Sequence, residues 1–540
     1  MTGHSSCGRG AMEVVIVGSG PSAAAAALAL DETPDVAITV LDLGGELESE
    51  RVTARSAMAR TAPDSWRPND LQLVSARPES GSPGELPTKQ IYGSNFPFQD
   101  FGQLDRIGAD AGANRLVVSG AYGGFSNTWG AQVMPYSTGT FRTWPIARSD
   151  LEPHYRDVLE RIPYAAESDD LEETFPLMGA PDRLPKVTAR TAGVLRRYEK
   201  HRIKVRAQGV IVGHARLALR ASACRLCGLC MTGCPYELIY SASQTFDELR
   251  SRRRVAYRSG VRVHRIEERD DGVSVHAIEI ATRQPVTLRA DKVFIGAGAI
   301  GTTRIVANSL GLTDRTVRMA ESVQYMVPFL SRKPETRLSQ QGEFTLNQFN
   351  LFVSFDSDGK DAALVHCYPY NDIMVDALPA VVATGPLSAL GRRGLRHLTV
   401  GLGYLPSWAS PSVDLRIGLA EEDGTLPPVR VKSGENEMTK PMLKRVIRQL
   451  RRCGPALDLF PIPGQTRISA PAKSYHFGGS FPMTSGGEGE FRSDLLGRVG
   501  PWRNVHLIDG SVFPTVPATT FTLTVMANAH RIAADAVGAT

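Results

Sequence analysis

The chain has 540 residues, of which 42% are hydrophobic and 22% charged, and its formal net charge is +5. This length predicts two or more domains, and the composition is that of a globular protein. The small charge does not favour nucleic acid as a partner, and no apolar run reaches the roughly 18 residues that a membrane span needs. The start lacks a signal-peptide pattern. We expect a cytoplasmic protein whose residues 1–11 form a disordered tail.

The segment from Glu13 to Asp42 is expected to form a strand, a turn, a helix and a second strand. The turn has the pattern G-x-G-x-x-A, in which Gly18 permits the bend, Gly20 lets the backbone approach a pyrophosphate, and Ala23 allows close packing. Pro21 and Ser22 open the helix, whose positive end attracts phosphate. Asp42 ends the second strand, where its carboxylate can accept a hydrogen bond from a ribose hydroxyl. The segment predicts a bound dinucleotide.

Further elements follow along the chain. Ser56–Glu85 is polar and rich in Pro and Gly, which indicates a surface excursion. A helix is expected over 150–160, capped by Ser149 or Asp150. Alternating polar and apolar residues from about 255 predict several short strands. A buried strand then leads into a helix at 298–308, and two more helices are expected at 441–452 and 523–537.

Four of the seven cysteines lie within eleven residues, in the pattern C-x2-C-x2-C-x3-C-P formed by Cys224, Cys227, Cys230 and Cys234. Bacterial ferredoxins use this run to bind iron–sulfur clusters. Gly228 and Gly233 remove side chains where the chain must wrap tightly. Two alternatives stay open: a structural loop with free thiols or a disulfide, and a zinc site, although zinc ligand pairs are normally farther apart in sequence.

Several separate blocks resemble the glucose-methanol-choline (GMC) oxidoreductases, FAD enzymes that oxidise alcohols and sugars. The blocks are AYGGFSNTWGAQVMPYS, ADKVFIGAGAIGTTRI, YHFGGSFPM and VHLIDGSVFPTVPATTFTLTVMANAHRIAADAV, in the order of the family. The resemblance implies an α/β fold with a discontinuous Rossmann-type FAD-binding domain, into which the cysteine-rich loop 224–238 is inserted, and a substrate-binding domain with a mixed α+β sheet. The FAD-binding domain would comprise 12–60, 90–148, 205–320 and 470–540, and the substrate-binding domain 149–204 and 321–469.

The resemblance also implies a catalytic base. The family's pattern H-x-x-G-[TS]-x-x-M is present as His476, Gly479, Ser480 and Met483. An imidazole can accept the proton of an alcohol at neutral pH while hydride moves to the flavin. Where the family places a second His or Asn, this chain has Thr520, whose hydroxyl can hydrogen-bond a substrate but is not a strong base. Thr520 is therefore either a positioning residue or a turn residue bonding its own backbone.

The flavin contacts that the resemblance implies come from three segments. They are a Gly-rich loop, the start of the helix at 298 and the turns before the last helix, and their residues are Gly123, Gly124, Ser126, Asn127, Gly298, Asp509, Gly510 and Thr520. No His or Cys in the Gly-rich loop offers a covalent tether, so FAD is expected to bind non-covalently.

The segment 325–465 carries little of the resemblance and is expected to cover the flavin and to set specificity. Its neutral polar side chains suit a sugar or polyol; they are Tyr325, Gln341, Gln348, Asn350, His366, Tyr368, Tyr370 and Asn371. Residues 377–408 mix apolar stretches with arginines, which allows a lid or a membrane-surface contact beside the plainer interpretation of a solvated loop.

The leading hypothesis from the sequence is a dehydrogenase that oxidises a hydroxyl of a sugar, polyol or sugar-bearing metabolite and passes the electrons to an external acceptor. An oxygen-using oxidase and a non-catalytic electron-transfer or redox-sensing protein are the alternatives.

Overall fold

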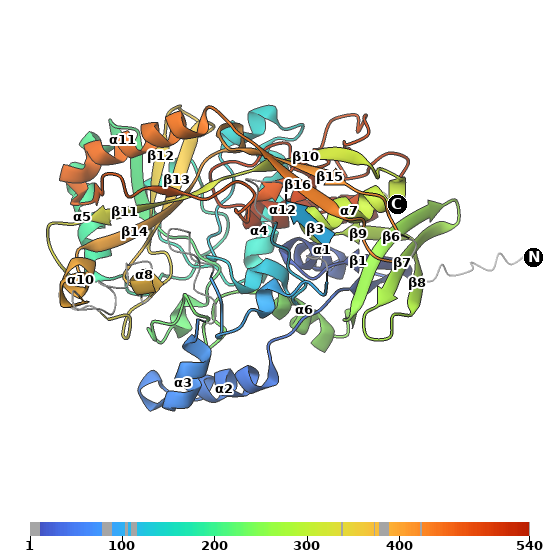
Figure 1. The fold of residues 1–540 in the computed structure, drawn as a ribbon, viewed down its shortest axis with the longest axis horizontal. Coiled ribbons are helices and arrows are strands. Elements are labelled where there is room, and N and C mark those ends of the chain that lie inside the picture. The colour runs from blue at the N-terminus through green and yellow to red at the C-terminus, as the bar shows by residue number, and fades with distance from the viewer. Residues whose placement is uncertain are drawn as a thin grey trace, which may run out of the picture.

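The computed structural model describes residues 11–77, 89–102, 106–109, 116–335, 339–371, 373–376, 388–421 and 424–538 (Figure 1). The predicted tail, apart from residue 11, and part of the segment 377–408 lie outside the described residues. None of the described helices combines the length and the apolar character that crossing a bilayer requires.

A five-stranded parallel sheet lies at the centre, in the order β20–β9–β1–β2–β5. Its strands are β1 (Met12–Val17), β2 (Val36–Leu41), β5 (Val255–Arg258), β9 (Lys292–Ile295) and β20 (Val505–Leu507). Helices α1 (Pro21–Asp31) and α12 (Thr522–Gly538) pack against each other beside it. Ala23–Ala27 of α1 are completely buried, because only methyl side chains let the helix approach its neighbours so closely.

An antiparallel sheet of seven strands forms the second layer, seen on the left of Figure 1. Its order is β17–β11–β14–β13–β12–β4, and β18 also pairs with β11. The strands are β4 (Val210–His214), β11 (Gln324–Leu330), β12 (Phe349–Ser354), β13 (Ala362–Tyr368), β14 (Leu398–Tyr404), β17 (Phe460–Pro461) and β18 (Arg467–Ile468). Helices α5 (Ala189–Arg206) and α11 (Thr439–Leu457) share one apolar cluster with this sheet.

Two smaller sheets complete the architecture. One is antiparallel, with β6 (Val261–Arg269), β7 (Gly272–Glu279) and β8 (Pro285–Ala290), and α7 (Gly298–Leu310) packs on β6. The other has the order β19–β10–β15–β16–β3. Its strands are β3 (Ile107–Ala109), β10 (Arg315–Glu321), β15 (Ser412–Ile417), β16 (Val429–Gly434) and β19 (Phe477–Gly478). The other helices are α2 (Ser49–Ala59), α3 (Pro68–Ser75), α4 (Arg148–Arg161), α6 (Ala242–Ser251), α8 (Ile373–Asp376) and α10 (Ser388–Leu395).

Most of the expected elements are present, and two details differ. The expected surface excursion, Ser56–Glu85, contains the end of α2 and all of α3, and these two helices project at the bottom of Figure 1. Helix α4 begins at Arg148, and Asp150 caps it from inside, because its carboxylate accepts from the backbone N–H of Ala147 at 2.8 Å. The predicted domain boundaries stay a prediction; β4 pairs with β12 in the seven-stranded sheet, although that prediction assigns 205–320 to the FAD-binding domain.

Candidate active site

The turn between β1 and α1 has the conformation that a phosphate-binding turn needs. Gly18 has φ +99°, and a Cβ there would lie 2.5 Å from the carbonyl oxygen of Gly296, so only glycine fits. A Cβ on Gly20 would meet nothing within 4 Å and would project into open space. No side chain caps the start of α1, and Pro21 occupies its first turn. The remaining N–H groups of this turn are available to an anion.

Asp42 follows β2, is buried, and faces the space beside the β1–α1 turn. Its Oδ2 accepts hydrogen bonds from the hydroxyls of Ser19 and, at 2.9 Å, Tyr257. Burial raises the pKa of Asp42 to about 6, and these two hydrogen bonds oppose the rise. The carboxylate is held rigidly at the end of the strand where the sequence predicts a ribose contact.

The predicted Gly-rich loop crosses over this turn. Gly124 comes so close that a Cβ on it would lie 3.3 Å from Cα of Gly20. Gly123 has φ +90° and donates its N–H to Ser19 at 2.9 Å. Asn127 donates to the carbonyl oxygens of Tyr122 and Gly124 at 2.9 and 2.8 Å, which shapes the loop from behind. The Gly-rich loop therefore packs directly against the β1–α1 turn.

One cavity of about 420 Å³ connects these parts with His476. The predicted cofactor residues that line it are Gly18, Gly20, Pro21, Ser22, Asp42, Gly124, Ser126, Gly298, Asp509, Gly510 and Thr520. Ala23, Gly123 and Asn127 do not line it: Ala23 packs in α1, and the other two support the Gly-rich loop. A Cβ on Gly20 or on Gly298 would meet nothing within 4 Å. Because these two glycines have no side chains, the cavity keeps room there for a dinucleotide.

His476 lies at the cavity between two aromatic rings. The rings of Tyr404 and Phe521 stack on it with centroid distances of 4.2 and 5.4 Å and interplanar angles of 19° and 17°. Its Nδ1 is buried and has no hydrogen-bond partner among the described residues. Burial, reinforced by the neighbouring His366, lowers the pKa of His476 to about 3. The imidazole is therefore neutral at physiological pH, with a lone pair able to accept a proton.

Thr520 lines the cavity, but its hydroxyl is already engaged. Its Oγ1 donates to the carbonyl oxygen of Met134 at 3.1 Å and accepts from the N–H of Met134 at 3.1 Å. This pairing ties the turn before α12 to the segment that follows the Gly-rich loop.

A buried polar network beside His476 includes one residue that sequence reasoning did not select, Gln132. Gln132 accepts from the N–H of Arg216 at 3.0 Å, so its amide nitrogen must be the donor that points to Asn350, at 2.8 Å. Asn350 donates to the carbonyl oxygen of His214 at 3.1 Å, and its Oδ1 lies 2.9 Å from Nδ1 of His366. Nδ1 of His366 also lies 3.0 Å from the amide nitrogen of Gln132, so the network holds the His366 ring through its Nδ1.

Of the eight polar side chains expected to contact substrate, His366 and Tyr368 line the cavity. Others are used elsewhere. Tyr325 is buried in the apolar cluster between the seven-stranded sheet and α11, and Gln348 donates to the carbonyl oxygen of Phe344. Gln324 and Tyr404, which the sequence did not mark, line the cavity as well.

The four-cysteine loop borders the same cavity. Among the described cysteines none forms a disulfide, and Cys230 is buried while Cys224, Cys227 and Cys234 are half-buried. Met231 lines the cavity directly after Cys230, and Lys89, another lining residue, interacts electrostatically with Cys230. The loop is thus a neighbour of the space in which the predicted dinucleotide would lie.

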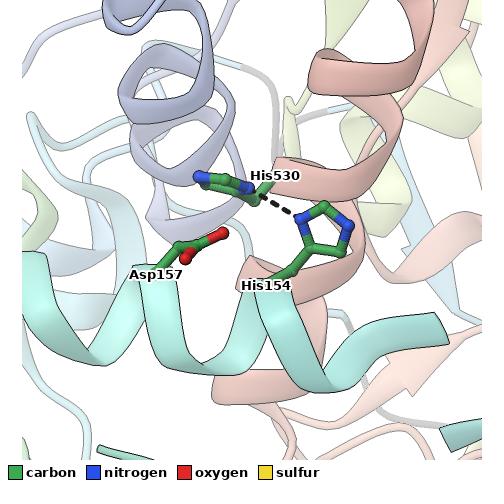
Figure 2. Close-up of side chains that lie close together, drawn as sticks. All are labelled: His154, Asp157 and His530. Atoms are coloured by element: carbon green, nitrogen blue, oxygen red, sulfur yellow. Dashed lines mark hydrogen bonds between the residues drawn. The ribbon is translucent and has the colours of Figure 1, made fainter. Parts of the chain in front are cut away.

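A second group of potential ligands lies outside the cavity, between α4 and α12 (Figure 2). Nδ1 of His154 lies 2.9 Å from Nδ1 of His530, and Asp157 lies beside them, with the three ligand atoms within 4.8 Å of one another. Burial lowers the pKa of His530 to about 4 and also lowers that of His154. One neutral ring donates its Nδ1–H to Nδ1 of the other, and this hydrogen bond joins the two helices.

No protein-family model and no curated protein matches the chain. Among solved structures, the chain is similar to pyridoxine 4-oxidase from Mesorbium loti, with a TM-score of 0.61 and 14% sequence identity over 97% of this chain and 98% of that chain. At this identity the similarity shows the fold alone. The predicted fold class is therefore confirmed: an α/β fold with a parallel Rossmann-type sheet and a second, antiparallel sheet.

Proposed function

We propose that the protein is a GMC-type, FAD-dependent oxidoreductase that oxidises a hydroxyl of a sugar, polyol or sugar-bearing metabolite to a carbonyl. The observation that carries the proposal is the single cavity shared by the dinucleotide-type turn and by His476. The sequence blocks that resemble the family supply the cofactor and the reaction class.

The lining residues suit FAD. The N–H groups after Gly20 would hold the pyrophosphate, Asp42 would accept from the ribose, and Gly124, Ser126 and Gly510 would contact the flavin end. Bound FAD supplies a hydride acceptor for the carbon that carries the hydroxyl. The chain's own residues must then orient the alcohol and receive its proton.

His476 is proposed as the base. Its low pKa keeps the imidazole unprotonated, and the stacked rings of Tyr404 and Phe521 hold its plane in one orientation. A positioned base of this kind contributes about 10²–10⁴ in rate. We propose His366 as the second polar group, because its ring lines the cavity and is held through Nδ1 by the buried network, whereas the Thr520 hydroxyl is engaged by Met134.

Substrate class is proposed from the chemistry of this end of the cavity. The aromatic side chains of Tyr368, Tyr404 and Phe521 line this end together with the neutral polar side chains of Gln324 and His366. Aromatic faces bind the C–H side of a sugar ring while neutral polar groups bind its hydroxyls. A neutral sugar or polyol carries no phosphate, so its binding requires no positively charged side chain.

Anaerobic reduction of the bound flavin by a panel of sugars and polyols tests the proposal. We expect at least one compound to bleach the flavin band, and His476→Asn to slow bleaching by about 10²–10⁴. His506→Asn, which removes another buried imidazole that lies outside the cavity, is the matched control. An unchanged rate in His476→Asn contradicts the catalytic role of His476, whereas a flavin that no compound of the panel bleaches favours a non-catalytic redox protein.

Electron delivery to an acceptor other than dioxygen is proposed because the four-cysteine loop borders the cavity. Turnover with ferricyanide that exceeds peroxide release supports a dehydrogenase. Peroxide release equal to substrate consumption in air identifies an oxidase.

A further inference from the structure

We propose that Cys224, Cys227, Cys230 and Cys234 bind an iron–sulfur cluster through which electrons leave the flavin site. The contacts of the four-cysteine loop itself support the proposed binding site. Only the direction of electron flow rests on the proposed function.

The backbone already directs hydrogen bonds at the sulfur atoms. The N–H of Leu226 points to the sulfur of Cys224, the N–H of Leu229 to that of Cys227, and the N–H of Tyr236 to that of Cys234. For each of these cysteines one donor lies two residues after it, and the N–H of Leu238 also points to the sulfur of Cys234. Such N–H···S bonds stabilise thiolates that ligate iron and set the potential of the cluster.

The backbone conformation of the four-cysteine loop requires glycine at two positions. Gly228 has φ +81°, and a Cβ there would lie 2.3 Å from the carbonyl oxygen of Gln340. Gly233 has φ +105°, and a Cβ there would lie 2.7 Å from the ring of Tyr92. Tyr92 also donates from its hydroxyl to the carbonyl oxygen of Cys234 at 2.9 Å. The loop is therefore fixed by its surroundings before any metal binds.

The four cysteines lie close enough to interact electrostatically with one another. Cys230 interacts electrostatically with each of the other three cysteines, and Cys234 also with Cys224 and Cys227. Within the described residues, however, no three of these sulfurs lie within 4.8 Å of one another. Thiolates around a single zinc ion, at about 2.3 Å from it, stand about 3.8 Å apart. Because each thiolate of a cluster binds a different iron, the wider spacing favours a cluster over zinc.

The position of the loop gives the cluster two neighbours. On the inner side, Cys230 is 8% exposed and adjoins Met231, which lines the cavity. On the outer side, Cys224, Cys227 and Cys234 are half-buried and so approach the surface. Oxidation of one hydroxyl to a carbonyl releases two electrons and two protons. The electrons would leave singly through the cluster, so two external one-electron acceptors are reduced in each turnover.

Metal and sulfide analysis of the anaerobically purified full chain tests the site without any variant. We expect about four iron and four acid-labile sulfide ions per chain, and an electron paramagnetic resonance signal after reduction with dithionite. Four thiols that react freely in the metal-free protein, or stoichiometric zinc in place of iron, would overturn the proposal.

Serine substitutions locate the ligands. Cys227→Ser and Cys234→Ser are expected to lose most of the iron while they keep FAD, because neither cysteine lines the dinucleotide cavity. Cys453→Ser, the same exchange at a buried cysteine in α11, is the matched control and is expected to keep both. Full iron content in both ligand variants contradicts the assignment.

Two outcomes distinguish failure of the proposed cluster from failure of the proposed function. A chain that contains the cluster but whose flavin no sugar or polyol reduces rejects the proposed function and leaves the site intact. A chain whose flavin is reduced by an alcohol, while the cluster signal stays absent, rejects the electron route.

Discussion

The pH dependence of flavin reduction is the sharpest prediction, because the surroundings of His476 determine it. An ordinary imidazole with a pKa near 6.5 is about 97% neutral at pH 8 and about 3% neutral at pH 5, so a base of that kind would lose activity about 30-fold. With the pKa of His476 lowered to about 3 by burial and by His366, the base stays neutral over this whole range. We therefore expect the rate of flavin reduction to change less than about twofold from this group.

The assay is anaerobic stopped-flow reduction with the best sugar or polyol, between pH 5 and pH 8. Phe521→Ala provides the comparison, because loss of one stacked ring lets water reach the imidazole and moves its pKa back toward the ordinary value. That variant is expected to lose rate at pH 5 relative to pH 8. A 30-fold acid loss in the unaltered protein would refute the assignment of a buried, neutral base.

The remaining predictions concern the cavity and the helix pair of Figure 2. His366→Leu is expected to raise KM for the best substrate about tenfold while FAD stays bound, because one hydrogen-bonding group is lost; an unchanged KM would remove His366 from the substrate site. Gly20→Val is expected to abolish FAD binding, whereas Gly193→Val, at an equally open glycine in α5, should leave the flavin content unchanged. His530 has a folded pKa of about 4 against about 6.5 unfolded, so its protonation favours unfolding as pH falls below 6.5. Between pH 7.5 and pH 5 the parent protein should therefore lose about 2 kcal/mol more unfolding free energy than His530→Asn, measured by urea titration; equal losses would contradict this.

Local patterns in the sequence were enough to predict the parallel sheet and its phosphate-type turn. The apolar run before Gly18 and the alanine run after Ser22 dictate a strand and a close-packed helix through neighbouring residues alone. The helix over 439–457 was equally predictable, because Met442, Val446 and Leu450 recur at helical spacing and are all buried.

Contacts between distant segments could not be predicted in this way. Gln132 and His366 meet although 234 positions separate them, and nothing near either residue marks the pairing. The engagement of Thr520 by Met134 spans 386 positions. The sequence pattern did not predict helices α2 and α3. Their buried residues are Ala54, Met58 and Val74, and these are too few to give an apolar period.

The three parallel rings of Tyr404, His476 and Phe521 also bear on regiochemistry. A ring stacked against two aromatic neighbours is restrained from turning to follow a mobile ligand, so its nitrogen offers one fixed point in space. Under the proposed reaction, a compound with several equivalent alcohol groups would be converted at the single group that reaches this point. The product would then be one ketone or aldehyde isomer rather than a mixture.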